Sequence, residues 1–126
     1  MRIFTTRGFN RLDVAGELSD ADLVAAVAEM NAGLWDVNLG GQVYKKRVAL
    51  AGRGKSGGAR TLVAFKSDDR AFFMYGFRKG QRSNITPKER KALKLMAREL
   101  LGYSNKQLRQ ALKHGALTEI EVQEDD

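Results

Sequence analysis

Apolar residues recur at the spacing of an amphipathic helix in the segment DADLVAAVAEMNAG, residues 20–33. Ser19 stands before this segment as the expected N-cap, and Asp22 follows three residues later, as in a capping box. Gly33 is the expected stop signal at the other end. The pattern predicts a helix whose inward face is formed by Leu23, Val27 and Met30.

A second helix is predicted, with stronger boundary signals, in ITPKERKALKLMARELLG, residues 85–102. Thr86 is the expected N-cap, Pro87 suits the first helical position, and Glu89 completes a capping box. Gly102 marks the expected end of the helix. The apolar positions predict an inward stripe formed by Leu93, Met96, Ala97 and Leu100.

The period of the apolar residues changes in the middle of the chain. VYKKRVAL (43–50), TLVAFK (61–66) and AFFMYGF (71–77) are rich in β-branched and aromatic residues, which predicts three strands. The SDDR sequence between the last two is typical of a turn. Asp68 and Asp69 are therefore interpreted as turn residues rather than as metal ligands.

Weaker signals complete the expected fold. The chain of 126 residues is expected to form one domain, residues 1–126, with a frayed acidic tail. The fold class predicted is α+β, with N-terminal helices packed on a mostly antiparallel, three- to five-stranded sheet and with C-terminal helices. The remaining predicted elements are an opening strand at Ile3 and Phe4, a helical stretch from about Arg7 to Ala15, a helix from Ser104 to His114, and an edge strand in ALTEIEV.

Positive charge is concentrated in one third of the chain, although the formal net charge of the whole is only +7. Residues 41–82 hold eleven Lys and Arg against two acids, a net charge of +9. Residues 1–40 sum to −3 and residues 83–126 to +1. A focused positive surface attracts a polyanion, usually nucleic acid, although a basic sheet face covered by an acidic partner protein would look the same.

The composition excludes several classes of chemistry. Cysteine is absent, which excludes a disulfide framework, a thiolate metal site and a cysteine nucleophile. His114 is the single histidine, which excludes a two-histidine metal or ribonuclease site within one chain. No apolar run approaches the ~20 residues of a transmembrane helix, and no signal peptide is recognisable. We therefore expect a cytoplasmic protein that needs no membrane, metal or cofactor.

A glycine-rich basic stretch, GRGKSGGAR at residues 52–60, precedes the second predicted strand. It is not a P-loop, because Ala49 stands where that motif needs a glycine and because a strand pattern follows. Its cations suit a phosphodiester. An RNA strand supplies its own nucleophile, the 2′-hydroxyl, and needs alignment, proton transfer and stabilisation of phosphoryl charge. Lysine can serve as a base when its pKa is lowered, and the planar arginine fork binds phosphate.

Two motifs, KSGGAR at residues 55–60 and FRKGQRSNI at residues 77–85, resemble the RelE/ParE superfamily of small bacterial toxins. They match the K-[SR]-G-G-x-R and F-x-K-x-x-R-x-N-I patterns of one branch, in order, and the similarity extends through most of the chain. The resemblance implies a microbial-ribonuclease-like α+β fold. It also implies a type II toxin that cleaves mRNA in the ribosomal A site and is neutralised by a cognate antitoxin.

The resemblance further implies roles for individual residues. Arg60 matches the family's arginine that contacts the scissile phosphate. Lys55 is the expected base or charge stabiliser, with Lys45 and Arg47 as competitors, and Arg82 is expected to assist the leaving group. The residues expected to bind the nucleic acid around this centre are Lys45, Lys46, Arg47, Arg53, Arg78 and Lys79.

The chain departs from the best-studied members of the superfamily in one respect. They carry a tyrosine shortly after the final arginine, which stacks on the substrate base, whereas this place falls near Thr86 here. Stacking then has to come from another aromatic residue, such as Tyr75 or Phe77. Two alternatives to the mRNA endonuclease stay open, namely a ParE-like inhibitor of DNA gyrase and a catalytically degenerate RNA-binding relative.

Overall fold

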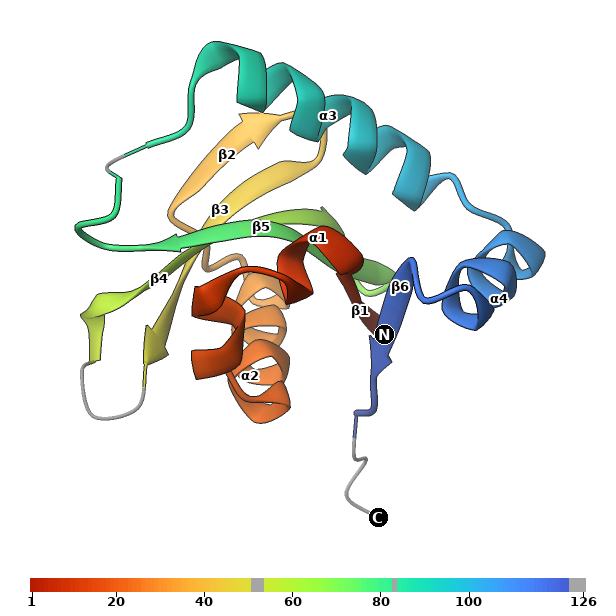
Figure 1. The fold of residues 1–126 in the computed structure, drawn as a ribbon, viewed down its shortest axis with the longest axis horizontal. Helices are drawn as coiled ribbons and strands as arrows, with labels where there is room; N and C mark the ends of the chain where they lie inside the picture. Colours follow the sequence, from red (N-terminus) through yellow and green to blue (C-terminus); the bar gives the residue numbers. More distant parts are fainter. Residues whose placement is uncertain (51–53, 83, 123–126) are drawn as a thin grey trace.

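The computed structural model describes residues 1–50, 54–82 and 84–122, with residues 54–57 described by their backbone alone. The order of helices and strands is the α+β arrangement that the sequence predicts (Figure 1). The elements are β1 (Arg2–Thr6), α1 (Arg7–Asn10), the 3₁₀ helix η1 (Asp13–Glu17), α2 (Asp20–Asn31), β2 (Val37–Gly40), β3 (Val43–Leu50), β4 (Gly54–Lys66), β5 (Arg70–Arg78), α3 (Pro87–Leu101), α4 (Asn105–Lys113) and β6 (Leu117–Ile120).

The described strands form one sheet of six strands in the order β2-β3-β4-β5-β1-β6. The strands from β2 to β5 follow one another as antiparallel neighbours. β1 is inserted beside β5 in parallel, and β6 pairs with β1 in the antiparallel direction. The sheet is therefore mostly antiparallel, as predicted, and β6 is the edge strand expected at the end of the chain.

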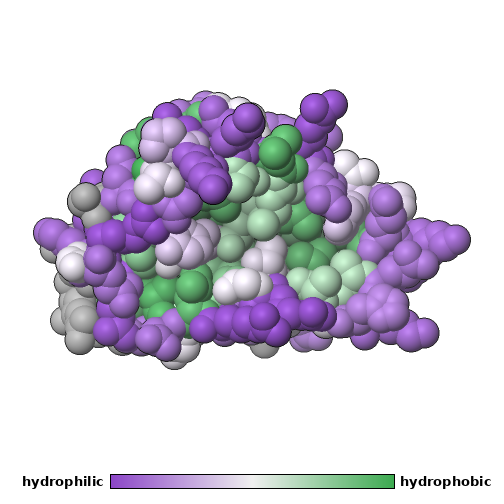
Figure 2. Space-filling view, turned by 45° about the horizontal axis from the view of Figure 1, so that its top comes forward, coloured by the Kyte–Doolittle hydropathy of each residue, from purple (hydrophilic) through white to green (hydrophobic). Residues whose placement is uncertain are grey.

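A layer of helix covers each face of the sheet, with α3 above it and α2 below it in the view of Figure 1. The cluster on the α3 side includes Phe4 and Phe72, whose rings stack with centroids 4.8 Å apart. The cluster on the α2 side includes Val27 and Phe73. Figure 2 shows that, on the face turned toward the viewer, hydrophobic residues lie in a hollow bordered by hydrophilic ones.

Three helices begin at capping boxes, which confirms the predicted starts. In each box the N-cap hydroxyl accepts a hydrogen bond from a backbone N–H in the first turn, and the side chain three residues on accepts one from the N-cap backbone. Such a cap stabilises a helix by about 1 kcal/mol. The three pairs are Ser19–Asp22 for α2, Thr86–Glu89 for α3 and Ser104–Gln107 for α4.

The inward stripe of α3 is narrower than predicted. Leu93, Ala97 and Leu100 are buried, but Met96 is 40% exposed, so its placement in the stripe was wrong. The three buried residues follow the spacing of four and then three residues that keeps side chains on one face, and Met96 lies beside that row. Within the described ranges, no helix combines the length and apolar character that crossing a membrane requires.

The sheet is larger than the predicted three to five strands. β2 was not predicted, because it is a four-residue strand that is held by pairing with β3 rather than by its own pattern. β4 begins at Gly54 rather than at Thr61, so much of the glycine-rich stretch is strand rather than loop. The helical stretch expected after the first strand is divided into α1 and η1.

Candidate nucleic-acid interface

Strand register places three of the predicted cations on the sheet face that α3 covers. Arg47 of β3 pairs with Arg60 of β4, and Lys45 pairs with Leu62, whose side chain belongs to the cluster on the α3 side. Because alternate residues of a strand share a face, Lys45, Arg47 and Arg60 all lie on that face. On the other side of β4, Arg60 pairs with Phe77 of β5.

Arg60 lines a pocket of about 350 Å³ together with Lys79, Gly80 and Arg82. Lys79 and Gly80 follow β5 directly, so the pocket joins the arginine of β4 to the segment after the last central strand. Arg60 is half-buried, and its Nη1 donates a hydrogen bond of 3.4 Å to the carbonyl oxygen of Gly58. Among the described residues it has no carboxylate partner. The structure thus brings Arg60, Arg82 and Lys79 to one pocket.

The guanidinium of Arg82 is held by several neighbours. Nη1 and Nη2 donate to the two carboxylate oxygens of Glu89 at 2.8 and 2.5 Å. Nε donates to the carbonyl oxygen of Asn84 at 2.8 Å, and Nη1 also contacts the hydroxyl of Tyr75 at 3.3 Å. The hydrogen bonds to Glu89 and Tyr75 raise the pKa of Arg82. Conversely, the hydrogen bond from Arg82, followed by one from the Thr86 backbone, lowers the pKa of Glu89 to about 2.

Asn84 connects Arg82 to a cation of the sheet. Its backbone carbonyl accepts from Arg82, and its side-chain Oδ1 accepts from the Nζ of Lys45 at 3.3 Å. The same Oδ1 accepts from the backbone N–H of Ile85 at 2.9 Å, which fixes the amide. Lys45 of β3 is thereby linked to the segment that carries Arg82, even though the two residues lie far apart in the sequence.

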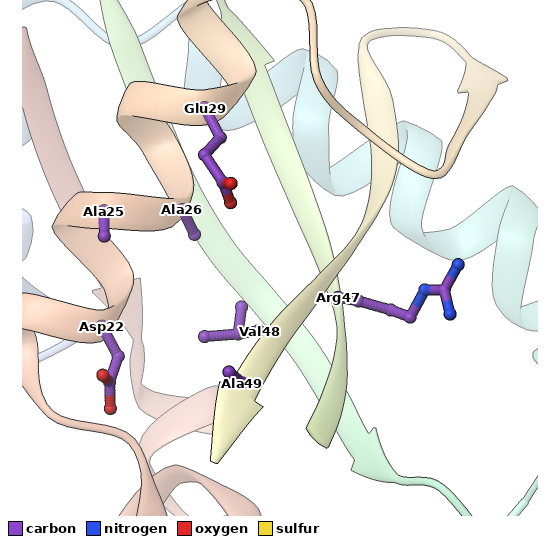
Figure 3. A pocket seen from close by; sticks show the side chains of 7 residues that line it. All are labelled: Asp22, Ala25, Ala26, Glu29, Arg47, Val48 and Ala49. Atoms are coloured by element: carbon purple, nitrogen blue, oxygen red, sulfur yellow. The ribbon is translucent and has the colours of Figure 1, made fainter. Parts of the chain in front are cut away.

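Lys46 does not join these residues. Its side chain is buried on the opposite face of the sheet, where its Nζ lies 3.0 Å from Oε1 of Glu29 on α2. Figure 3 shows the division at β3, with Glu29 directed from α2 toward the strand and Arg47 directed away from α2. A buried ammonium of this kind is stabilised by its carboxylate partner and is not accessible to a polyanion. Lys46 is therefore part of the packing between α2 and the sheet and is not exposed as a nucleic-acid ligand would be.

Two other predicted cations have acidic partners. Arg47 donates from Nε to Asp36 Oδ1 at 2.8 Å, and its backbone N–H donates to Oδ2 at 2.6 Å. Partial burial of Asp36 raises its pKa, but the hydrogen bonds from Arg47 and the positive charge of Arg47 outweigh this, so the pKa of Asp36 is lowered. Arg78 forms an ion pair with Glu17 of η1. Since Arg78 pairs across the sheet with Ala59, a residue packed against η1, it faces away from the pocket.

Two predicted residues lie beyond what the structure describes. Arg53 is outside the described residues, and the backbone of Lys55 belongs to β4 while its side chain is not described.

The aromatic candidates for base stacking differ in exposure. Phe77 is 2% exposed and is a core residue, whereas Tyr75 is half-buried. The Arg82 guanidinium lies 5.9 Å from the ring centre of Tyr75 and 5.6 Å from that of Phe77.

Sequence reasoning gave no role in the site to two residues that now have contacts there. Asn84 belongs to the second motif but was given no function, and Glu89 was interpreted only as a capping residue. The signal for Asn84 was its place in the motif. Nothing local signalled that Glu89 would bind Arg82, because a capping box already accounts for a glutamate or glutamine at this position.

The arrangement is suited to an anion with several oxygen atoms. Arg60, Lys79 and Arg82 present two guanidinium groups and an ammonium to one pocket. Arginine forks form pairs of hydrogen bonds with phosphate oxygens, and fixed donors of this kind stabilise charge that develops on them. The positive charge of the residues that line the pocket is therefore suited to a phosphodiester.

Comparison with known proteins places the chain in a family. The model of the family described as "RelE toxin of RelE / RelB toxin-antitoxin system" matches residues 1–120. None of the curated proteins compared with the chain matches it. The family match covers β1 to β6 and both motifs that carry the resemblance. The chain therefore belongs to the RelE family of toxins, which act in toxin–antitoxin systems of the RelE/RelB type.

Proposed function

We propose that this toxin is a ribosome-dependent mRNA endonuclease, whose partners are mRNA on the ribosome and a cognate antitoxin. The observation that carries the proposal is the pocket shared by Arg60, Lys79 and Arg82. A binding surface needs cations only along the path of the nucleic acid. An enzyme that cleaves by 2′-hydroxyl attack needs them around one phosphate.

Arg60 is the residue assigned to the scissile phosphate. It lies at the pocket between Arg47 of β3 and Phe77 of β5, and apart from Gly58 no described residue accepts a hydrogen bond from it. Most of its N–H donors are therefore available to the non-bridging oxygens of a phosphodiester. The charge on these oxygens increases as the 2′-oxygen attacks, so the bonds from Arg60 strengthen in the transition state.

The remaining roles are those that the family resemblance implies. Arg82, fixed at the rim of the same pocket, is assigned to the side of the leaving 5′-oxygen, and Lys79 to the adjoining backbone. Lys45 is linked to Arg82 through Asn84 and competes with Lys55 for the role of base or charge stabiliser. The proton of the 2′-hydroxyl passes to the base as the 2′-oxygen forms a bond to phosphorus. The bond from phosphorus to the 5′-oxygen breaks, and the proton returns from the base to the leaving 5′-oxygen through solvent water, so the products are a 2′,3′-cyclic phosphate and a 5′-hydroxyl.

The first experiment is induction of the wild-type chain and of Arg60→Ala in a bacterial host without the antitoxin. The wild type should stop growth and produce cuts within translated mRNA. Arg60→Ala should grow and leave transcripts intact, with a cleavage rate lower by about 10²–10³-fold in a reconstituted translation system. Lys66→Gln is the matched control, because it removes an exposed cation at the end of the same strand, β4, and it should retain the toxicity of the wild type.

Three results would contradict the proposal in different ways. DNA breaks linked to gyrase with intact mRNA would replace it by the ParE-like alternative. Salt-dependent RNA binding without any cut product would indicate a binding relative. Equal cleavage by the wild type and Arg60→Ala would mean that the pocket is not the active site.

A further inference from the structure

Glu89 has two sets of contacts that are usually made by different residues. Its Oε1 accepts a hydrogen bond of 2.8 Å from the backbone N–H of Thr86, which completes the cap of α3. Both carboxylate oxygens also accept from Arg82, at 2.5 and 2.8 Å. The first turn of α3 is thereby joined to the pocket that Arg60 and Arg82 line.

The cap alone does not require the charge of Glu89. In the same chain, α4 has an equivalent capping box. There the uncharged side chain of Gln107 accepts a hydrogen bond from the backbone N–H of Ser104. Glutamine and glutamate both serve at this position of a capping box. A carboxylate near a phosphate pocket also repels the ligand, which counts against an acid here unless it has a second use.

The second role of Glu89 is to fix the position of Arg82. A guanidinium has five N–H donors, and the described neighbours Glu89, Tyr75 and Asn84 accept four of them. One N–H on Nη2 has no partner among the described residues. The side chain is thus held on several sides, with a single donor remaining for a ligand in the pocket.

We propose that Glu89 is a positioning residue, which holds the Arg82 guanidinium in the orientation that contacts the RNA phosphate. The proposal rests on the proposed function, since it assumes that the pocket receives a phosphodiester. Glu89 does not touch the substrate and acts only through Arg82. Loss of the Glu89 charge leaves α3 capped but allows the Arg82 side chain to adopt other rotamers. Binding of RNA then has to order this side chain, at a cost in conformational entropy.

The test compares the wild type, Arg82→Ala, Glu89→Gln and the double variant in mRNA cleavage on translating ribosomes, with the maximal rate and the half-saturating ribosome concentration measured separately. Arg82→Ala and Glu89→Gln should each lower the maximal rate by about tenfold or more. The double variant should cut no more slowly than Arg82→Ala. Thr86→Ala is the control, since it loses the hydroxyl cap but keeps the Arg82–Glu89 pair. It should unfold at a lower temperature and cut at the wild-type rate.

Two outcomes overturn the inference while leaving the proposed function in place. One is a Glu89→Gln variant that cuts as fast as the wild type or faster, which would mean that Glu89 is neutral or withholds Arg82. The other is a double variant whose loss is the product of the two single losses, which would mean that Glu89 does not act through Arg82.

If the wild type does not cut mRNA, the proposed function fails and the inference is decided by binding. The probe is then a short single-stranded RNA whose 2′-hydroxyls are methylated. Arg82→Ala should weaken binding of this RNA several-fold in the wild-type background and much less in the Glu89→Gln background. Equal weakening in both backgrounds overturns the inference.

Discussion

The two arginines of the pocket differ in how many of their hydrogen-bond donors are already engaged. Among the described residues, the Arg60 side chain donates one hydrogen bond, to the carbonyl of Gly58, whereas Arg82 donates to Glu89, Asn84 and Tyr75. An arginine with several free N–H donors can form several hydrogen bonds to a phosphate, whereas an arginine with one free donor can form only one. Arg82 is therefore the more rigidly held of the two, and the open donors of Arg60 support the proposal that it is the principal phosphate ligand.

The pair of Arg82 and Glu89 makes a specific contribution to the pH dependence of stability. The folded-state pKa of Glu89 is about 2, below its ordinary value of 4.5. A depressed carboxyl pKa stabilises the folded state above the unfolded pKa, and this contribution is lost as the pH falls through the folded pKa. The stability that Glu89 provides should thus be complete above pH 4.5 and disappear toward pH 2.

Unfolding curves of the wild type and Glu89→Gln at a series of pH values test this expectation. The difference in unfolding free energy between the two proteins should be constant near neutral pH and should shrink between pH 4.5 and 2. Comparison with the variant is needed, because Asp36 and Glu119 also have lowered pKa values and titrate in both proteins. Parallel curves over this range would contradict the assignment.

At the scale of the elements, the glycines of the first motif have a steric reason. A Cβ at Gly58 would lie well inside contact distance of the Val48 carbonyl oxygen and only 3.1 Å from the Cα of Ala49. The pairing of β3 with β4 changes register between Val48 and Leu50, so the two backbones approach closely here. Gly58 therefore allows β4 to continue past the irregularity and to present Arg60 two residues later.

Gly58→Ala should destabilise the protein and impair the pocket together. Because the close atoms are backbone, the strands have to separate, which we expect to cost about 1–3 kcal/mol. Thermal unfolding and cleavage assays on the same preparation would detect both effects. Gly16→Ala in η1 is the matched control, since a Cβ there meets no atom within 4 Å and the wild-type behaviour should be kept. A Gly58→Ala variant as stable as the wild type would contradict the steric argument.

Element scale also shows where sequence reasoning succeeds. The helix starts were predicted because a capping box is complete within four residues and needs no distant partner. The strand β2 and the early start of β4 were missed because both depend on pairing with β3, which a local pattern does not contain. Lys46 and Arg47 lie on opposite faces of the sheet, as alternation along a strand requires, but the local pattern does not show that Glu29 of α2 pairs with Lys46.

For the whole molecule, the uneven distribution of charge along the chain has a structural consequence. Acids of the negative first third pair with cations of the positive middle third, and part of the +9 is neutralised in the fold. The cations of the pocket region without a carboxylate partner among the described residues are Lys45, Arg60 and Lys79, all from the face or rim that α3 covers. Within the part of the chain that the structure describes, the ion pairs between the two thirds are Glu17–Arg78, Glu29–Lys46 and Asp36–Arg47.

The sequence alone predicted a surface that attracts a polyanion, but it did not show that Lys46, Arg47 and Arg78 are paired with acids within the fold. The ion pairs join residues that lie far apart along the chain, and only the tertiary fold brings them together. Lys55, Arg60 and Arg82 were predicted as one site from the motifs; Arg60 and Arg82 line one pocket, and their catalytic roles stay a prediction. The spacing of residues along the chain does not show which of the other cations form ion pairs with acids and which stay free to bind RNA.

The adjacent residues Arg78 and Lys79 give the sharpest test of this division. Both were predicted to hold the RNA backbone, but Arg78 is paired with Glu17, whereas Lys79 is exposed and lines the pocket with Arg60. Each phosphate contact on single-stranded nucleic acid adds about −0.7 to the slope of log affinity against log salt. For a short RNA with methylated 2′-hydroxyls, Lys79→Gln should reduce the steepness of that slope by about 0.7, and Arg78→Gln should change it much less. Arg78→Gln should instead lower the unfolding temperature, because Glu17 loses its partner. Equal changes of slope in the two variants would show that ion pairing within the fold does not decide which cations bind RNA.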